Sequence, residues 1–469
     1  MPTRRDTLKI SAATLAAAAA PRWVLAGESA RAAPADGPDP LARIAAFEKM
    51  AFGMFVHWGL YSQWGQGEWV KHMYNIGTDD YMRRMAEFTA ADFSGRDLAR
   101  VAKRAGMKYV TLTSRHHDGF SLYDTRGLSP YDVTHTPAKR DLIADFTEGC
   151  RAEGIVPMLY CTTLDWTDPR FDSDWDAYQQ YLRDSVELLC TRYGPIGGFW
   201  FDGNWSRKDA DWQEDQLYGL IRKHQPDAMI INNTGIGKGG ALGHPEIDST
   251  TFERGRPEPV DRTGWPKHVA GEMCHTFNYH WGIATKDFNY LSPAHVIEEF
   301  CRCRRAGANL LMNVGPTASG RVPDYEAAAL TRVGDWISQI GTDALYDGRA
   351  VAFETTPDAA VASNNTDDHQ SDVAHEDFGL VVERPGGPPE MYLYVFNITA
   401  TADTRAHGST ARGPGPRTFR GVPGGFTTAR WMDNNAEAKL ERRGDLTVLH
   451  AEKFPYGNNT VVRVARLSR

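Results

Sequence analysis

The chain contains little cysteine and no long run of basic residues. Its six cysteines are scattered through apparent helices and strands of a 469-residue chain. They lack the dense spacing of a disulfide scaffold, so we expect buried free thiols. The formal net charge is −8 at pH 7. A chain with an acidic balance and no basic patch lacks the positive surface that binds a phosphate backbone, so no nucleic-acid partner is expected.

A hydrophobic run of membrane-spanning length is also absent. The apolar run Ile10–Ala20 is rich in alanine and much shorter than the roughly 20 residues of a membrane-spanning helix. Arg4 and Arg5 precede it and small residues follow it, so residues 1–35 resemble a twin-arginine export signal, from which Thr7 departs. A membrane anchor is the alternative interpretation. We expect a cleaved signal and a soluble mature protein exported to the periplasm or beyond.

Apolar and amphipathic stretches alternate from about Phe52 to Gly341, which predicts repeated β/α units. The best-marked helix begins after Ser292 and ends before Gly307. A chain of this length can hold a barrel of roughly 250 to 350 residues, so we predict a (β/α)8 TIM barrel over residues 40–342. Its expected strands are Phe52–His57, Lys108–Ser114, Ile155–Cys161, Gly198–Asp202, Ala228–Asn233, Ile247–Phe252, Glu272–Phe277 and Asn309–Val314.

The pattern changes after residue 345. Loop-forming runs occur at Asn364–Asp368 and Pro385–Pro389, and no helical pattern separates the strands that follow. We therefore predict a second domain, a C-terminal β-sandwich over residues 346–469. Its expected strands include Met391–Phe396, Leu446–Leu449 and Thr460–Val464. No sequence feature sets an oligomeric state.

Polar, aromatic or acidic groups follow four of the expected barrel strands. In a closed parallel barrel the carboxyl ends of the strands form one mouth, where active sites lie. The strongest signal is Gly198–Asp202, an aromatic strand that delivers a carboxylate to its end. A pocket of histidines, tryptophans and two carboxylates suits a sugar, and cleavage of a glycosidic bond needs two carboxyl groups. The four segments are Val56–Gly59, Ser114–Phe120, Trp200–Gly203 and Thr250–Arg254.

These segments resemble a known family, the α-L-fucosidases of glycoside hydrolase family 29, over roughly Phe47–Pro323. The resemblance rests on Phe52–Ser62, on Lys108–Val110 with His116–Phe120, and on Asn309–Pro316. It implies a retaining exo-α-L-fucosidase that acts on fucosylated oligosaccharides or glycoconjugates through a covalent aspartyl intermediate. No cofactor and no metal ion are implied. The implied nucleophile is Asp202, and the implied sugar contacts are His57, Glu68, Trp69, His116, His117, Tyr160, Trp200 and Trp281.

The general acid/base is assigned to Glu253. Its segment Asp248–Arg254 follows an expected strand and is similar to a family stretch with a glutamate after an aromatic residue or proline. Glu246 and Glu272 are the rivals. A purely structural alternative is that Glu253 forms a solvated ion pair with Arg254, worth under about 1 kcal/mol. The corresponding alternative for Asp202 is an ion pair with Arg254.

Two departures from the family leave the substrate open. The family commonly continues its fifth-strand asparagines into an arginine, whereas this chain reads Asn232-Asn233-Thr234-Gly235. In the third strand, Cys161-Thr162 replaces the more usual Tyr-Ser. The alternatives are an exo-glycosidase for a related sugar such as α-L-galactose, and a carbohydrate-binding protein whose catalysis has lapsed.

A metal site is a further alternative for the histidines, with Asp118 as an additional ligand. Adjacent side chains of an extended chain point to opposite sides, so His116 and His117 are not expected to reach one ion. Three further tryptophans are expected to pack or to lie at the rim rather than to bind sugar: Trp58, Trp64 and Trp205.

Overall fold

The computed structural model describes residues 41–234, 242–255, 257–340, 343–351, 354–355, 377–383, 387–396, 416–451 and 460–469. The export signal predicted at residues 1–35 lies outside these ranges, as do Gly341 and the predicted loop Asn364–Asp368.

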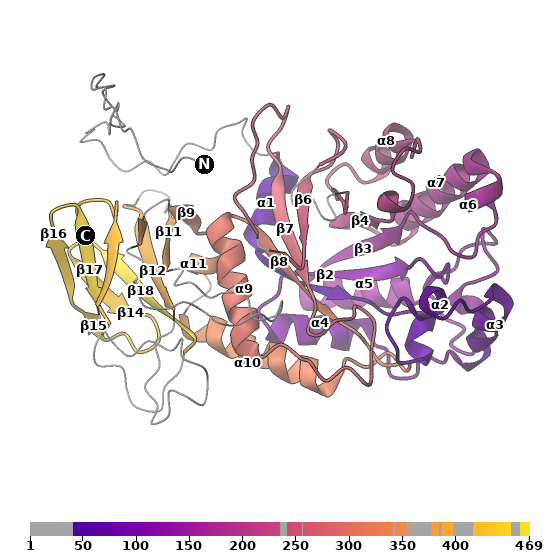
Figure 1. Cartoon of the computed structure of the whole chain (residues 1–469), viewed down its shortest axis with the longest axis horizontal. Helices are drawn as coiled ribbons and strands as arrows, with labels where there is room; N and C mark the ends of the chain where they lie inside the picture. Colours follow the sequence, from indigo (N-terminus) through magenta and orange to yellow (C-terminus); the bar gives the residue numbers. More distant parts are fainter. Residues whose placement is uncertain are drawn as a thin grey trace, which may run out of the picture. The chain divides into compact units, whose positions relative to one another are not determined.

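Eight parallel strands close into a barrel in which each strand pairs with the next and β8 pairs with β1 (Figure 1). All eight predicted strands are confirmed, with ends shifted by two residues or fewer. The strands are β1 Phe52–Val56, β2 Tyr109–Arg115, β3 Val156–Thr162, β4 Gly198–Asp202, β5 Met229–Asn232, β6 Ser249–Glu253, β7 Ala270–His275 and β8 Asn309–Val314.

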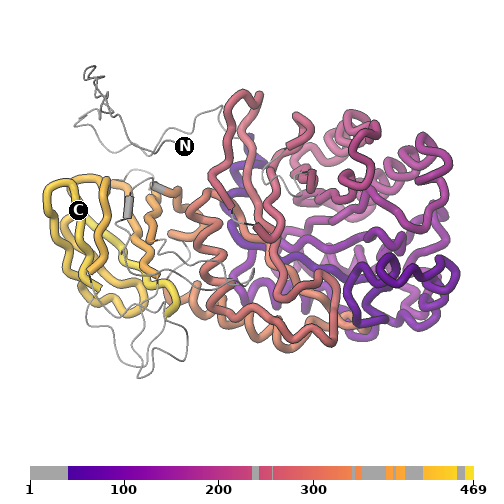
Figure 2. The backbone as a smooth tube through the Cα atoms, in the orientation of Figure 1, coloured from indigo at the N-terminus to yellow at the C-terminus, as the bar shows by residue number. Residues whose placement is uncertain are grey.

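Helices lie between most of these strands, but the described residues between β5 and β6 and between β6 and β7 form no helix. Figure 2 shows the path of the backbone. The α-helices are α1 Ala42–Met50, α2 Val70–Met73, α3 Thr78–Met82, α4 Gly95–Arg104, α5 Leu142–Glu153, α6 Arg170–Ser173, α7 Trp175–Arg192, α8 Glu214–His224, α9 Pro293–Ala306, α10 Asp324–Ile340 and α11 Asp343–Tyr346. Short 3₁₀ turns lie at Leu60–Gln63, Arg83–Glu87, Val133–His135 and Asn204–Ser206.

Helix α9 has the ends that its sequence predicts. The hydroxyl of Ser292 accepts a hydrogen bond from the backbone N–H of His295, and Pro293 occupies the first turn. Gly307 follows the last turn at φ 75°, a left-handed conformation that glycine adopts without steric cost.

Side chains of β4 alternate between the barrel interior and the surrounding helices. Trp200 belongs to the inner hydrophobic cluster, whereas Phe199 and Phe201 belong to the outer one. Because the side-chain period of a strand is two, Asp202 faces the interior, at the carboxyl end. Gly203 then turns the chain away at φ 124°, and a Cβ there would lie 2.6 Å from the backbone nitrogen of Leu164.

The opposite end of the barrel is closed by α1 and by an ion cluster. Ile44 and Phe47 of α1 pack into the inner cluster. Asp248 is fully buried just before β6. Burial alone would raise its pKa, but the surrounding cations lower the pKa below its usual value. This end is therefore structural. The cations that contact the Asp248 carboxylate are Arg43, Arg222 and Lys267.

The C-terminal region forms two antiparallel sheets, so the predicted barrel with a C-terminal β-sandwich is confirmed. The six-stranded sheet has the order β15-β14-β18-β12-β11-β9 and the four-stranded sheet has the order β10-β13-β17-β16. The strands are β9 Arg349–Val351, β10 Glu354–Thr355, β11 Phe378–Val382, β12 Glu390–Phe396, β13 Pro416–Arg420, β14 Thr428–Trp431, β15 Glu437–Ala438, β16 Leu440–Arg443, β17 Leu446–His450 and β18 Val462–Ser468.

All six cysteines are buried and free, as predicted. Over the described ranges, no helix combines the length and the apolar character that crossing a membrane requires.

Candidate active site

A cavity of about 70 Å³ opens at the carboxyl end of the barrel. Strands β1 to β7 and the segments that follow them all contribute side chains to it. The cavity is lined by Phe55, His57, Trp69, His116, His117, Tyr160, Trp200, Asp202, Trp205, Asn233, Glu253 and Trp281.

Nine of the ten site residues expected from the sequence lie in this lining. The tenth, Glu68, does not line the cavity. It is buried, and its carboxylate accepts hydrogen bonds from the backbone N–H groups of Trp281 and Gly282, at 3.0 and 2.8 Å. Glu68 therefore fixes the segment that carries Trp281 into the cavity wall.

Asp202 is surrounded by hydrogen-bond donors. Trp205 Nε1 donates to Oδ1 over 2.9 Å, and the Tyr160 hydroxyl donates to Oδ2 over 3.1 Å. His117 Nε2 lies 3.4 Å from Oδ2. Burial would raise the pKa of the Asp202 carboxyl, but these donors outweigh burial and lower that pKa below its usual value. The carboxylate is therefore kept ionised.

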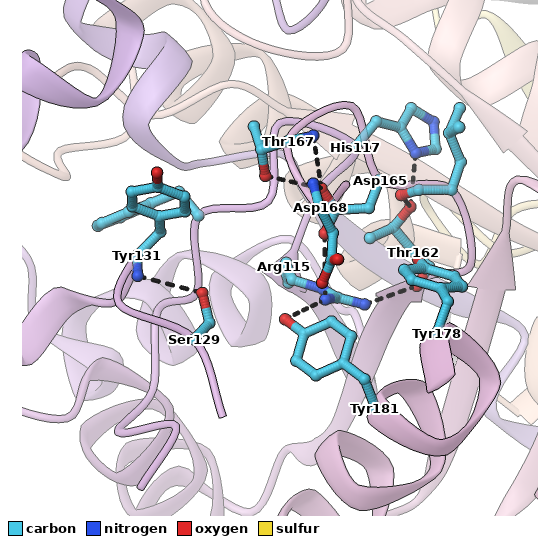
Figure 3. A network of polar contacts seen from close by, with 12 residues as sticks. Arg115, His117, Ser129, Tyr131, Thr162, Asp165, Thr167, Asp168, Tyr178 and Tyr181 are labelled. Carbon is cyan, nitrogen blue, oxygen red and sulfur yellow. Dashed lines mark hydrogen bonds and ion pairs between the residues drawn. The ribbon is translucent and has the colours of Figure 1, made fainter. Parts of the chain in front are cut away.

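His117 Nδ1 donates a hydrogen bond to the Thr162 hydroxyl. The Thr162 hydroxyl has a single proton, which it donates to the carbonyl oxygen of Leu164 over 2.5 Å. The same hydroxyl lies 2.6 Å from His117 Nδ1 (Figure 3), so it accepts there and Nδ1 carries a proton. Nε2 lies 3.4 Å from the Asp202 carboxylate, and this contact is among those that lower the pKa of Asp202.

Asn233 bridges the two candidate catalytic carboxyl groups. Its Nδ2 lies 2.7 Å from Glu253 Oε2 and 3.4 Å from Asp202 Oδ1. Its carbonyl oxygen accepts from the Thr251 hydroxyl at 3.0 Å, which identifies the nitrogen side of the amide. The two carboxylate oxygens can be no farther apart than the sum of these contacts, about 6 Å.

Glu253 differs from Asp202 in its electrostatic environment. Burial, followed by the negative charge of Asp202, raises the pKa of Glu253 to about 7. Arg254, the alternative ion-pair partner of either acid, donates instead to the carbonyl oxygen of Tyr279 at 3.3 Å. The site thus contains one carboxyl group held ionised and a second that is still about half protonated at pH 7.

The two rival glutamates lie away from the cavity. Glu246 is half-exposed and pairs with Arg222 at 3.0 Å. Glu272 is buried within the barrel, where it accepts hydrogen bonds from Tyr109 and from Trp200 Nε1, the latter at 2.8 Å. Burial raises the pKa of Glu272 to about 7, yet its carboxyl group serves to hold the Trp200 indole.

Two further histidines are neutral. Burial lowers the pKa of His57 to about 3, and its Nδ1 lies 2.7 Å from the amide oxygen of Asn313 on β8. Nδ1 therefore donates there, which leaves Nε2 as an acceptor. Burial also lowers the pKa of His116 well below its usual value. Its Nδ1 has no hydrogen-bond partner among the described residues.

The cavity brings His116 and His117 onto the same side, contrary to the expectation for an extended chain. Their ring centroids are 4.2 Å apart. Strand β2 ends at Arg115, and the N–H of Gly119 donates to the carbonyl oxygen of His116 over 3.0 Å. The histidines therefore lie in a turn, where the alternation of a strand does not apply.

Asp118 does not join the histidines. Its carboxylate accepts from the Tyr81 hydroxyl at 2.7 Å and from the backbone N–H of Phe120 at 3.2 Å. Over the part of the chain that the structure describes, no group of three or more His, Cys, Asp or Glu side chains is arranged to hold a metal ion.

Three lining residues were missed by the sequence reasoning. Trp205 packs against a hydrophobic cluster, as expected, but it also lines the cavity, because the turn after Gly203 brings its indole N–H to Asp202. Phe55 and Asn233 had a usable signal. Phe55 lies two residues before His57, and Asn233 two residues after Ile231 of the inner cluster, so the period of a strand places both inside.

Comparisons with known proteins agree with this geometry. The model of the family described as Alpha-L-fucosidase matches residues 38–342. A putative α-L-fucosidase of Caenorhabditis elegans is 25% identical over 334 residues, which cover 65% of this chain and 66% of that protein, just under two thirds of its length.

Two solved structures show the same fold. α-L-Fucosidase isoenzyme 1 of Paenibacillus thiaminolyticus is 28% identical, with a TM-score of 0.72 over 91% of this chain and 98% of that one. A family 29 α-L-fucosidase of Bacteroides thetaiotaomicron, solved as a trapped covalent intermediate with 2-fluoro-fucosyl fluoride, has a TM-score of 0.73 at 22% identity. The match covers 93% of this chain and 98% of the Bacteroides chain.

Proposed function

Since the chain belongs to the α-L-fucosidase family, we propose that it is an exo-α-L-fucosidase that hydrolyses terminal α-L-fucosyl residues with retention of configuration. Asp202 is the nucleophile and Glu253 is the general acid/base. The substrate is a fucosylated oligosaccharide or glycoconjugate.

The contact that supports this mechanism best is the amide bridge of Asn233. Retaining glycosidases hold their two carboxyl groups about 5–5.5 Å apart, whereas inverting enzymes need about 6.5–9.5 Å to admit a water molecule. The bridge limits the separation of the two carboxylate oxygens to about 6 Å. That spacing favours direct attack by Asp202 over attack by an interposed water.

In the first step, Asp202 Oδ attacks the anomeric carbon while the bond to the leaving oxygen breaks. The proton of Glu253 passes to that oxygen, so the aglycone departs as an alcohol. His117, Trp205 and Tyr160 keep Asp202 ionised before the attack. An aspartyl-fucosyl ester results.

The second step depends on a fall in the pKa of Glu253. The ester carries no charge, so the contribution of Asp202 to that raised pKa disappears. Glu253 then takes a proton from water, whose oxygen attacks the anomeric carbon and releases Asp202. Fucose leaves with its configuration unchanged.

The uncharged side chains of the cavity have a matching role. His57 and His116 are neutral, so each can exchange hydrogen bonds with sugar hydroxyls without a cost for burying charge. The rings of Trp69, Trp200 and Trp281 provide apolar surface for the sugar ring.

The central test is the stereochemistry of hydrolysis. An aryl α-L-fucoside should yield α-L-fucose first when the reaction is followed by proton NMR, and Asp202→Ala should remove turnover while leaving fucose binding. Initial release of β-L-fucose would contradict the retaining mechanism. Faster turnover of an aryl α-L-galactoside would reassign the sugar.

The acid/base assignment has its own test, with Glu246→Ala as the matched control. Glu253→Ala should slow substrates with poor leaving groups far more than activated aryl fucosides. Azide should restore its turnover and give a fucosyl azide of retained configuration. The assignment fails if Glu246→Ala shows this pattern instead.

Export through the twin-arginine route is part of the same proposal, supported by Arg4 and Arg5 ahead of a mild apolar run. Replacement of both arginines by lysine should leave the enzyme inside the cell. Unchanged export of that variant would exclude the route.

A further inference from the structure

A second, larger cavity lies beside the catalytic one. Its volume is about 380 Å³. The segment around α2 forms one side of it, and the loop between β3 and α6 with α6 itself forms the other. Its lining includes Lys71, His72, Leu164, Trp166, Asp168 and Asp172.

Aromatic rings form a common wall between the two cavities. Trp166 of the larger cavity lies 5.1 Å from Trp69 and 5.4 Å from His117, measured between ring centroids. Both of those rings line the catalytic cavity. His72 stacks on Trp166 at 5.2 Å and contacts Trp69 at 5.3 Å. A ligand in the larger cavity would therefore be separated from a sugar beside Asp202 only by this layer of aromatic rings.

The loop that carries Trp166 is held in place by a buried network (Figure 3). The Arg115 guanidinium contacts Asp165 at 3.3 Å, the Tyr181 hydroxyl at 2.5 Å and the Thr162 carbonyl oxygen at 3.3 Å. Asp165 Oδ1 in turn accepts from Thr167, through both its N–H and its hydroxyl. The Trp166 N–H donates to the His117 carbonyl oxygen over 2.8 Å. The Trp166 platform is thus built before any ligand binds.

The carboxylates of the lining are already paired with arginines. Asp168 forms a two-point contact with Arg170, and Asp172 lies 2.6 Å from Arg207. The ammonium group of Lys71 donates to the carbonyl oxygen of Ile76 at 3.2 Å. An anionic ligand would meet these carboxylates, whereas sugar hydroxyls can add hydrogen bonds to paired carboxylates and pack an apolar ring face on the indole.

We propose that this side cavity binds a second, neutral sugar unit of the substrate glycan, with Trp166 and His72 as its platform. The proposal rests on the proposed function, because it assigns the part of the substrate that the small catalytic cavity leaves outside. It makes the enzyme selective for oligosaccharides over simple fucosides.

The test compares two substrates in each variant. These are 4-nitrophenyl α-L-fucoside and the better of 2′-fucosyllactose and 3-fucosyllactose. In His72→Ala, the kcat/KM ratio of trisaccharide to aryl fucoside should fall about 5-fold, the effect of one lost aromatic contact. Asp172→Ala at the exposed rim should lower the same ratio. His135→Ala, an exposed histidine that lines neither cavity, should leave the ratio unchanged.

Lactose, the leaving group of both trisaccharides, provides a readout that needs no turnover. Calorimetric titration should detect lactose binding to the wild type and a weaker binding to His72→Ala. An unchanged ratio in both variants, or no lactose binding to the wild type, would overturn the side-cavity proposal. Failure of the wild type to hydrolyse any fucoside would overturn the proposed function, and the lactose titration would still test the cavity.

Discussion

The pKa values of the two carboxyl groups are shifted in opposite directions because their neighbours differ. Asp202 has four donors around it and a lowered pKa, whereas Glu253 has a single amide donor and the charge of Asp202 nearby. A small change in either set of neighbours should therefore appear in the pH profile.

The high-pH limb of kcat/KM should report Glu253. Its pKa is about 7, and the acid must be protonated in the first step, so kcat/KM should fall as the pH rises through about 7. The low-pH limb should lie below the ordinary aspartate range, because the pKa of Asp202 is lowered. Initial rates of an aryl fucoside with a poor leaving group measure both limbs.

Two controls make this assignment specific. α-L-Fucosyl fluoride needs no protonation of its leaving group, so its high-pH limb should be absent. Glu272→Gln should retain the limb, although the pKa of Glu272 is also about 7. Persistence of the limb with the fluoride would refute Glu253 as its source.

Thr162 should affect the pKa of the nucleophile Asp202 through His117. Thr162→Val keeps the side-chain shape but removes the acceptor of His117 Nδ1, so the His117 ring is no longer held with its Nε2 beside Asp202. The pKa of Asp202 should then rise, because His117 is among the groups that lower it, and the low-pH limb of kcat/KM should move up by about 1 pH unit.

Thr111→Val is the matched control for this change. Thr111 is buried on β2, and its hydroxyl has no hydrogen-bond partner among the described residues. Thr162→Ser should restore the wild-type profile. If Thr162→Val lowers the rate equally at every pH, Thr162 has only a packing role.

Which residues were predictable follows from how each one reaches the cavity. Asp202, Glu253 and His57 lie on or directly after strands, where alternation decides the direction of a side chain. Trp205 reaches the cavity through a turn, and Glu68 acts on the backbone of a segment more than 200 residues away. Sequence spacing carries no information on either contact.

At the scale of elements, the loop between β3 and α6 depends on a glycine in the loop that follows β2. Gly119 has φ 79°, and a Cβ there would lie 2.0 Å from the Thr167 hydroxyl and 2.9 Å from Asp165. Gly119→Ala should therefore lower the melting temperature through two effects. One is backbone strain of about 1–2 kcal/mol, and the other is displacement of the Thr167 side chain. Differential scanning calorimetry measures the loss.

Gly154→Ala separates these two effects. Gly154 ends α5 at φ 74° with nothing within 4 Å of its added Cβ, so that variant should show the strain alone. Equal losses in the two variants would mean that the loop yields to the clash without cost.

The barrel strands were predictable because a buried parallel strand is apolar over its whole length. The ends of the strands were less predictable than their existence. The expected Glu272–Phe277 begins at Ala270 in the structure, because pairing with β6 and β8 sets the ends of β7 and the apolar run does not. The two sheets of the C-terminal region have weaker signals, since several of their strands are only two to five residues long.

At the scale of the whole molecule, β12 joins two hydrophobic clusters. Tyr392, Tyr394 and Phe396 belong to the large cluster that includes residues of α9 and α10. Met391, Leu393 and Val395 alternate with them and belong to the core between the two sheets. The indole of Trp336 on α10 also donates to the carbonyl oxygen of Val462 at 2.9 Å. Barrel and sheets therefore share one packed interior.

This continuity predicts a single cooperative unfolding transition. Leu393→Ala removes a fully buried side chain from the sheet core and should cost about 2–5 kcal/mol. Because other side chains of the same strand belong to the cluster that includes residues of α9 and α10, the loss of aryl fucosidase activity on heating should shift down with the calorimetric transition, although Leu393 lies outside the active site. Thr428→Ala, at an exposed position of β14, should shift neither. Two separate transitions, with activity following only the upper one, would show that the barrel holds its fold without the sheets.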